Sequence, residues 1–521
     1  MKSIYKFIVA PMFAGLLFPG CIDDLDTLPL STNILVSEKA WQQESTYTQF
    51  LAKIYAGFSI SGNNGPSGNC DIVGNDEGET TFIRSWWNLQ ELPTDEVKIA
   101  WSDEGLSGLQ FDQFTSDNRF CKLAFDRMYV SIAFCNEFLI QTTDDKLASR
   151  SMSSISDMVN GYRFEVRAAR AINYYYLLDL FGNIPFVDES TGIGAHYPEQ
   201  KDRKFMFSWI ESELLACDGF LPERSADNYG KITNPVVEMM LAKLYLNAEV
   251  YCGQNRYDDC IKYLDKVIAA GYSIDPYYKR MFEADNNESP EIIFPVCFDG
   301  KNATTYGGIT YLMATAYGSD MDPATNFGMA QSWSGTRACE DLPKYFTDGD
   351  SRALFYTDKR TLENTAWNDY YQGYAVVKFT NLRLDGAATS DNLFPDTDFP
   401  LMRLADAYLM YAEAVLRGGN GNRNSAINYV NEIRKRAGVD LISDSQLTLD
   451  FILDERAREL YWEGCRRTDL IRFGYFTKGK KWAWKGGVYS GVENIDSKYT
   501  LFPLPSDELS ANPGIKQNEG Y

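Results

Sequence analysis

The sequence of 521 residues contains a single histidine, His196, and this scarcity excludes several kinds of site. A metal site with two histidine ligands, including the HExxH motif, is impossible, and one Ser-His or Cys-His arrangement is the most that the chain can form. No Cys-x-x-Cys pair occurs either, so nothing indicates a structural zinc or a redox-active dithiol. The sequence therefore implies no cofactor.

Positive charge is also in short supply. The chain has 50 Lys and Arg against 72 Asp and Glu, a net charge of −22 at pH 7. A polyanion would be repelled, so nucleic acid is not an expected partner, and neither is an anionic membrane surface. Aromatic residues, in contrast, are plentiful at 14% of the chain.

Long apolar runs are confined to the N-terminus. Lys2 and Lys6 precede a nearly continuous apolar stretch over residues 7–18, which predicts a secretory signal peptide over residues 1–20. That stretch is too short to remain as a membrane-spanning helix, and no later run reaches 18 apolar residues. We therefore expect an exported chain without a transmembrane segment.

The end of this signal resembles a bacterial lipobox. Residues 17–21 read Leu-Phe-Pro-Gly-Cys, and the lipobox cysteine, here Cys21, is lipidated and becomes the first residue, although Phe18 and Pro19 depart from the usual pattern. The acidic residues 22–26 resemble the surface-export signal of some outer-membrane lipoproteins. Several acyl chains would anchor the chain stably. The alternative is an ordinary cleaved signal followed by an incidental cysteine.

The other nine cysteines are too few, and odd in number, for a disulfide-based scaffold. Cys252 and Cys260 are the one pair that could meet, across a helix hairpin at residues 253–255. Most of the remainder lie on apolar helix faces and are expected to be buried.

Helical periodicity dominates the chain, and the predicted helices come in pairs. Apolar residues recur at spacings of three and four along each of them, and Asn234-Pro235 and Gly271 mark one start and one stop. Such pairs are typical of tetratricopeptide-like scaffolds, which bury their cores by stacking. The predicted helices cover residues 39–57, 119–141, 164–180, 205–221, 234–252, 257–271, 404–415, 427–437 and 449–464.

Between the helices lie long segments of a different composition. Residues 61–107 and 299–400 are rich in Gly, Asn, Asp, Thr, Tyr and Trp and show little helical period. Loops of this length usually carry function. The length of the chain would allow two to four domains. We predict one mainly α-helical domain over residues 21–521, with helices over about 36–290, a loop-rich binding insertion over 291–400, and further helices and a tail over 401–521.

Four separated blocks of sequence carry a family resemblance. They are residues 165–185, residues 403–414 with the pattern RxAD…LxxAEA, residues 453–472 with ERxxEL…EGxRxxDLxR, and the end of the chain with NPxxxQNxGY. In this order they resemble the RagB/SusD family. The resemblance implies a glycan-binding lipoprotein on the surface of a Gram-negative outer membrane, which acts as a lid on a SusC-like TonB-dependent β-barrel transporter.

Charged residues of the third block recur at helical spacing, among them Glu455, Arg456, Glu459 and Glu463. A glycosidase would need two carboxyl groups on opposite sides of one bond, one of them with a raised pKa. Carboxylates on one helix beside arginines favour structural ion pairs instead. We therefore predict a protein that is not an enzyme, with a glycosidase as the alternative.

A sugar offers apolar faces and a rim of hydroxyl groups, so its site needs aromatic rings beside planar polar groups. The first long loop supplies such residues, and the second supplies a W-x-G-x-R turn and a Gly-rich stretch where starch-binding members of the family place stacking aromatics. Trp87 and Trp333 are the leading candidates, because both are expected in exposed, non-helical loops. The other first-rank candidates are Asp76, Arg84, Asn88, Tyr306, Tyr311 and Arg337, and the second rank is Trp101, Trp367, Tyr370 and Tyr371.

Two further possibilities stay open. Relatives in the family import peptides, so a peptide-binding lid is an alternative to a glycan-binding one. The acidic pairs Asp320/Asp322 and Asp348/Asp350 could hold Ca²⁺, but no EF-hand spacing is present, and solvated turns explain them better.

Overall fold

The computed structural model describes residues 37–191 and 197–521, and the predicted signal peptide, Cys21 and His196 lie outside these residues. The described chain is mainly helical, as expected. Its helices are α1 (Ser37–Ala40), α2 (Glu44–Ser59), α3 (Phe82–Glu91), α4 (Leu106–Gln110), α5 (Arg119–Gln141), α6 (Asp144–Ser149), α7 (Ser156–Phe181), α8 (Arg203–Cys217), α9 (Asn234–Leu246), α10 (Ala248–Cys252), α11 (Tyr257–Ala269), α12 (Gly308–Ala316), α13 (Pro323–Phe327), α14 (Leu404–Leu416), α15 (Arg423–Ala437), α16 (Leu449–Leu460), α17 (Arg466–Arg472) and α18 (Ser506–Ala511).

Strands are short and pair two by two, each pair antiparallel. They are β1 (Gly62–Asn63), β2 (Asn69–Cys70), β3 (Val97–Ile99), β4 (Ile184–Phe186), β5 (Glu199–Lys201), β6 (Ile292–Val296), β7 (Thr336–Ala338), β8 (Phe355–Tyr356), β9 (Ala375–Val376) and β10 (Phe399–Arg403). The β3–β7 pair joins the two long loop segments, with Lys98 opposite Arg337.

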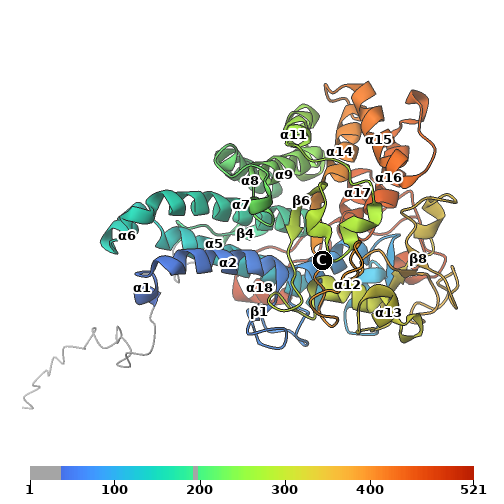
Figure 1. Ribbon diagram of the computed structural model, residues 1–521, viewed down its shortest axis with the longest axis horizontal. Coiled ribbons are helices and arrows are strands. Elements are labelled where there is room, and N and C mark those ends of the chain that lie inside the picture. The colour runs from blue at the N-terminus through green and yellow to red at the C-terminus, as the bar shows by residue number, and fades with distance from the viewer. Residues whose placement is uncertain (1–36, 192–196) are drawn as a thin grey trace, which may run out of the picture.

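The helices stack in an order that follows the chain. Helix α5 packs on α7, α7 on α8, α8 on α9, α9 on α11, α11 on α14, and α14 on α15. Figure 1 shows the resulting arc, with the yellow and gold loop-rich segments gathered at the lower right of the view. Each of these helices buries apolar residues against its neighbours, which is how a tetratricopeptide-like array builds its core. The expected helical scaffold is therefore confirmed.

Local capping explains where several helices begin and end. The Asp202 side chain accepts a hydrogen bond from the Phe205 backbone nitrogen at 2.8 Å and starts α8. The expected helix over 234–252 is divided at Asn247, whose side-chain amide donates to the Lys243 carbonyl at 2.9 Å. Gly253, with a φ of 72°, then ends α10 in the left-handed conformation.

One large hydrophobic core runs from Trp41 in the first described residues to Ile515 near the end of the chain. A smaller core, including Cys339, Leu470 and Trp482, lies beneath the C-terminal turns. Cys252 and Cys260, which could have met across the hairpin, are both free and buried.

The two long segments are less irregular than expected. Residues 61–107 contain α3, and 299–400 contain α12 and α13. Helix α3 packs against α5, α12 and α17, and all ten of its residues are buried. Its apolar residues Phe82, Ile83, Trp86 and Trp87 recur at helical spacing, and its polar residues are buried as well, against neighbours that are distant in sequence.

Candidate functional site

Trp87 does not lie in an exposed loop, and this expectation was wrong. It belongs to α3, its ring has no exposed surface, and its indole nitrogen donates to the Trp462 carbonyl at 3.0 Å. The ring meets Tyr311 and Trp462 edge to face, with centroid separations of 6.3 and 5.3 Å. A ring enclosed in this way has no face to offer a sugar, so Trp87 is a core residue.

Arg337 also turns inward, because it lies on β7 and is fully buried. Its guanidinium donates to the Gln372 carbonyl at 2.6 Å and to the carbonyl of Trp367. Burial lowers the pKa of Arg337 to about 10. The residue therefore fastens the loop around Trp367 to the β3–β7 pair and does not line a binding surface.

Asn88 and Tyr311 are buried one layer below the surface. The Tyr311 hydroxyl donates to Asn88 Oδ1 at 2.9 Å, and burial raises the pKa of Tyr311 to about 12. Arg84 lies over the Tyr311 ring, with its guanidinium carbon 4.5 Å from the ring centroid. Asn88 and Tyr311 therefore lie beneath the candidate site and do not line it, and we call this buried layer the floor of the site.

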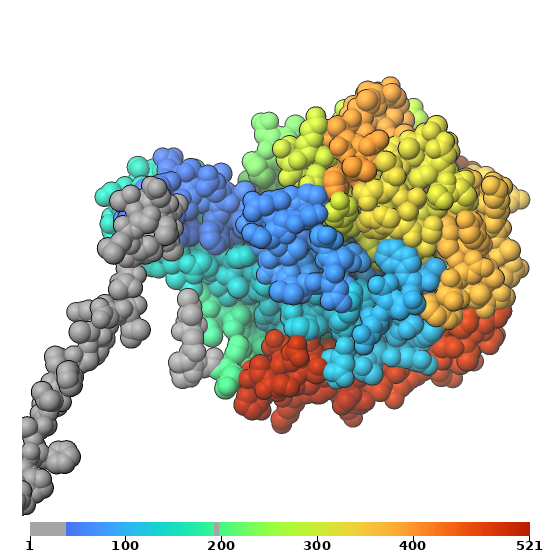
Figure 2. Space-filling view, turned by 90° about the horizontal axis from the view of Figure 1, so that it is seen from below, coloured from blue at the N-terminus to red at the C-terminus, as the bar shows by residue number. Residues whose placement is uncertain are grey.

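A cleft of about 310 Å³ opens above this floor. Four of the predicted residues, Asp76, Arg84, Tyr306 and Trp333, line it together. Figure 2 shows the face where the blue segment before α3, the light-blue segment after β3 and the yellow segment around α12 meet. The cleft is completed by residues that sequence analysis ranked second or missed: Trp101, Ser67, Glu77 and Asp103.

Trp101 and Trp333 form one aromatic unit in the cleft. The Trp101 indole nitrogen donates to the Trp333 carbonyl at 3.2 Å, and the two rings lie 6.4 Å apart at an interplanar angle of 39°. Both side chains are half-buried. Gly335 makes this possible, because a Cβ there would come within 2.8 Å of the Trp101 ring.

The turn that carries Trp333 is fastened to the end of α12. The backbone nitrogens of Trp333, Ser334 and Gly335 donate to carbonyls of α12 and Tyr317 at 2.6, 2.9 and 2.7 Å. Ser334 has a φ of 52°, in the left-handed region. The turn therefore holds the Trp333 ring in a fixed direction before any ligand arrives.

Tyr306 supplies a third ring from the start of α12. It is half-buried and meets Phe394 edge to face at 5.2 Å. Gly78 and Gly307 let the loop before α3 pass directly against the segment of Tyr306, because a Cβ on either glycine would overlap atoms of the opposite segment. Two loops distant in sequence are thereby joined at the cleft.

The polar side of the cleft is organised by Asp76 and Arg84. The guanidinium donates two parallel hydrogen bonds to the carboxylate, at 2.8 and 2.9 Å. The Arg84 side chain is 8% exposed and that of Asp76 is 42% exposed, so the carboxylate faces the cleft. Glu77 and Asp103 are exposed at the same rim, which makes the cleft acidic overall.

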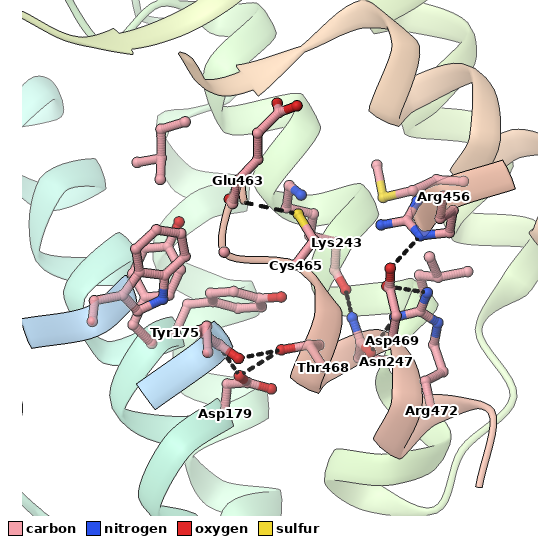
Figure 3. Close-up of a pocket in the computed structure, with 17 residues that line it drawn as sticks. Tyr175, Asp179, Lys243, Asn247, Arg456, Glu463, Cys465, Thr468, Asp469 and Arg472 are labelled. Carbon is pink, nitrogen blue, oxygen red and sulfur yellow. Dashed lines mark hydrogen bonds and ion pairs between the residues drawn. The ribbon is translucent and has the colours of Figure 1, made fainter. Parts of the chain in front are cut away.

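A second cavity is enclosed among helices α7, α9, α16 and α17 (Figure 3). Its volume is about 40 Å³, enough for a few water molecules and too small for a sugar. Arg456 binds Asp469 at 2.7 Å and Asp406 at 2.8 Å in its wall. Nearby, burial would raise the pKa of Glu413, but Arg472 and Arg417 hold it at about 2.

The charged residues of the third sequence block form buried ion pairs of this kind. Glu459 binds Arg352 and Arg403, and Glu463 binds Arg403 at 2.7 Å. The arginines hold the pKa of Glu459 well below its usual range despite burial. Their structural role, expected from helical spacing, is therefore confirmed.

Asp320 pairs with Arg360 and Asp350 with Arg352, and no group of three His, Cys, Asp or Glu residues suited to a metal occurs within 37–191 and 197–521.

Known proteins resemble this chain along almost its whole length. The profile of the SusD family matches residues 324–521. The starch-binding protein SusD of Bacteroides thetaiotaomicron is 32% identical, with 99% of this chain and 98% of that protein aligned, and a SusD-like protein of Bacteroides ovatus is 22% identical over 86% of each.

Solved structures share the fold. Surface glycan-binding protein A from Bacteroides thetaiotaomicron, in complex with laminarihexaose, has a TM-score of 0.68 at 19% identity, covering 91% of this chain and 99% of that one. A SusD superfamily protein from Parabacteroides distasonis has a TM-score of 0.70 at 21% identity, covering 94% and 100%. Together with the full-length relative at 32% identity, these findings place the chain in the SusD family.

Proposed function

We propose that this chain binds a neutral, curved glycan of the starch type in the cleft of Trp101, Tyr306 and Trp333. The observation that carries the proposal is the hydrogen-bonded pair of Trp101 and Trp333, whose faces are inclined by 39°. Inclined rings match a polysaccharide chain that bends and would contact a flat chain on one ring only. The starch-binding relative at 32% identity supports the same class of ligand.

The binding energy expected from each aromatic ring is modest. Each ring would remove roughly 50–80 Å² of apolar surface from water, which is worth about 1.3–2 kcal/mol at 25 cal/mol per Å². Ordering of the sugar and of side chains offsets part of this. Two or three rings therefore give affinities suited to capture and release.

Charge favours an uncharged sugar. Within residues 37–191 and 197–521, Arg84 is the one cation that lines the cleft, and both oxygens of Asp76 already accept from it. Glu77 and Asp103 would repel carboxylated or sulfated sugars. The Asp76–Arg84 pair instead offers acceptors and a rigid planar edge to hydroxyl groups.

The proposed role is binding without hydrolysis. A glycosidase needs a carboxyl group whose pKa is raised by an apolar environment and a second carboxyl across the scissile bond. The three carboxyl groups in the cleft are exposed, and Asp76 is bound to an arginine. None of the three therefore has the apolar environment that a catalytic acid needs.

We also propose that the chain is anchored through lipidated Cys21 at the cell surface and passes its glycan to a SusC-like TonB-dependent transporter. The support is membership of the family together with the lipobox-like sequence. None of the helices described here is long and apolar enough to cross a membrane. Isolation of the tagged native protein without a β-barrel partner of this type would contradict the transporter role, because an obligate interface of more than roughly 2,000 Å² survives mild detergent.

Isothermal titration of the purified chain tests the ligand class. The probes are maltoheptaose, laminarihexaose, an oligogalacturonate and a mixture of short peptides, each also titrated into the Trp101→Ala/Trp333→Ala variant. We expect binding of maltoheptaose that the double variant abolishes, and no new reducing ends after long incubation. Binding of peptides alone would favour the peptide-lid alternative, and sustained release of reducing ends would favour a glycosidase.

A further inference from the structure

Four aromatic side chains gather outside the cleft and have no part in it. Phe111 follows α4, Trp367 lies in the loop fastened by Arg337, and Trp484 and Tyr489 belong to a turn near the C-terminus. Phe111 meets Trp367 edge to face at 5.7 Å and stacks on Trp484 at 5.5 Å, and Trp484 lies 6.1 Å from Tyr489. We call these four residues the outer platform.

The outer platform touches a hydrophobic core only through Trp484, which packs against the smaller one. All four side chains keep part of their surface exposed, and Phe111, Trp367 and Tyr489 pack against neither hydrophobic core. Val488, beside them, is 45% exposed. Aromatic side chains gathered at the surface from three separate segments, with apolar area left in water, mark a binding surface.

The rings are held in place by specific contacts. Trp484 has a φ of 71°, which is costly for a bulky residue, and its indole nitrogen donates to the Asn364 carbonyl at 2.6 Å. The Gly486 backbone nitrogen donates to the Phe111 carbonyl at 3.0 Å, which joins the C-terminal turn to the end of α4. These contacts fix the directions of the rings, so a ligand would not have to order them.

The outer platform and the cleft are both attached to the short β3–β7 strand pair. Trp101 follows β3 by two residues and Trp333 precedes β7 by three, while Arg337 in β7 holds the loop of Trp367. Helix α4, about 8 Å long at 1.5 Å per residue, separates Trp101 from Phe111. In Figure 2 the light-blue segment that contains α4 borders yellow segments on one side and gold and red segments on the other.

The chemistry around these rings is that of a sugar site. Gln113 and Asn368 are exposed at the rim, and the Tyr489 hydroxyl donates to Glu340 at 3.0 Å. Planar polar groups beside aromatic faces suit a neutral sugar better than they suit an apolar protein surface. The Gln113 amide nitrogen donates to the Gly486 carbonyl at 3.1 Å, which fixes the direction of this amide. We infer that the outer platform is a second contact for the same polysaccharide chain that the cleft binds. This inference rests on the proposed function of the cleft.

Two contacts on one chain predict a dependence on ligand length. A short oligosaccharide fills the cleft alone, whereas a polymer that reaches both places binds the second intramolecularly and gains apparent affinity. The test uses the full-length chain and the Trp367→Ala/Trp484→Ala variant, titrated with maltotriose and with soluble amylopectin. The matched control is Tyr277→Ala, which removes a ring that is 58% exposed elsewhere on the surface.

We expect the double variant to bind maltotriose as the wild type does and amylopectin about tenfold more weakly. The Trp367→Phe/Trp484→Phe variant should recover most of the lost affinity, because it keeps two rings. The control should bind both ligands normally. Melting temperatures of all variants should stay close to that of the wild type, since most of the outer platform lies outside the cores.

Unchanged amylopectin affinity in the folded double variant would overturn the inference. An equal loss for maltotriose and amylopectin would also overturn it, because the rings would then act through the cleft. So would loss of a copurifying β-barrel protein with both affinities intact, which would make the outer platform a protein interface. A wild-type chain that binds neither ligand would instead refute the proposed glucan specificity of the cleft, before any variant is compared.

Discussion

The indole nitrogen of Trp101 donates to the main-chain carbonyl of Trp333, 3.2 Å away, so each of the two cleft tryptophans fixes the other. Their effects on glycan affinity should therefore be coupled. We expect Trp101→Ala and Trp333→Ala each to weaken binding of maltoheptaose about tenfold. The double variant should differ from the sum of the singles by about 0.5–2 kcal/mol. Titration of all four proteins closes this cycle, and strict additivity would show that the two rings act on the ligand independently.

Trp87→Ala should act on stability and not on affinity. The Trp87 ring is fully buried and its indole nitrogen is hydrogen-bonded, so truncation should cost about 3–5 kcal/mol of unfolding free energy. Urea denaturation measures the loss, with Trp333→Ala as the matched tryptophan variant that should melt nearly as the wild type does. Maltoheptaose affinity of the folded Trp87→Ala protein should stay within about twofold, and a tenfold loss would return this residue to the binding surface.

The contrast between these tryptophans shows what sequence could and could not reveal. Helices such as α5 and α11 were predictable, because apolar residues repeat along one face. Helix α3 has the same kind of repeat but is only ten residues long and was missed. The burial of its polar residues Arg84, Ser85 and Asn88 depends on neighbours that are distant in sequence, so no local pattern marks it.

The same limit applies to the site. Whether Trp87 or Trp101 is enclosed depends on the packing of α3 against α12 and on the β3–β7 register, which are contacts between segments distant in sequence. The motif around Trp333 was informative because it has a local cause: Gly335 makes room for Trp101. Its arginine was misassigned, because burial of Arg337 depends on the loop around Trp367, which no motif marks.

Arg84→Lys should weaken glycan binding although the charge is kept. The guanidinium makes two parallel hydrogen bonds to Asp76 and lies flat over Tyr311, and an ammonium group can do neither. We expect a three- to tenfold loss of maltoheptaose affinity by titration, with a small decrease in Tm. Arg383→Lys is the matched control, because it alters an exposed Arg–Asp pair far along the chain. Equal maltoheptaose affinities of Arg84→Lys and Arg383→Lys would mean that the two parallel hydrogen bonds of the Arg84 guanidinium do not contribute to ligand binding.

Cys21→Ala should release the protein from the outer membrane, because the lipidated Cys21 is the proposed anchor. Lipid chains contribute about 0.8 kcal/mol per buried CH₂ and hold after salt washing, whereas a charge-based association is screened within about 10 Å at 0.1 M salt. The measurement is fractionation of cells that express each form, with Cys252→Ala as the control that keeps the anchor. A Cys21→Ala protein that still sediments with washed membranes would show that another feature holds it there.

Glu91 and Glu96 face each other in the interior, and their titration should make the fold less stable as pH rises. Burial and the neighbouring Glu96 raise the pKa of Glu91 well above its usual value, and burial raises the pKa of Glu96 to about 7. In the unfolded chain both titrate near pH 4.3. Between about pH 4.5 and 7 the folded state therefore holds more protons, so the stabilising contribution present below pH 4.5 is lost as pH rises.

Glu91→Gln should flatten this decline. The amide can still accept from the Gly464 backbone nitrogen, as Glu91 does at 2.6 Å, and it can donate to Glu96 without a titrating proton. We expect the fall in unfolding free energy between pH 5 and pH 8 to shrink by about 1–3 kcal/mol, measured by urea denaturation across that range. Asp112 and Asp398, whose pKa values burial also raises to about 7, titrate equally in both proteins, so the difference isolates the pair. Glu519→Gln, at an exposed position, should leave the slope unchanged, and a Glu91→Gln slope identical to that of the wild type would mean that the two carboxyl groups do not share a proton.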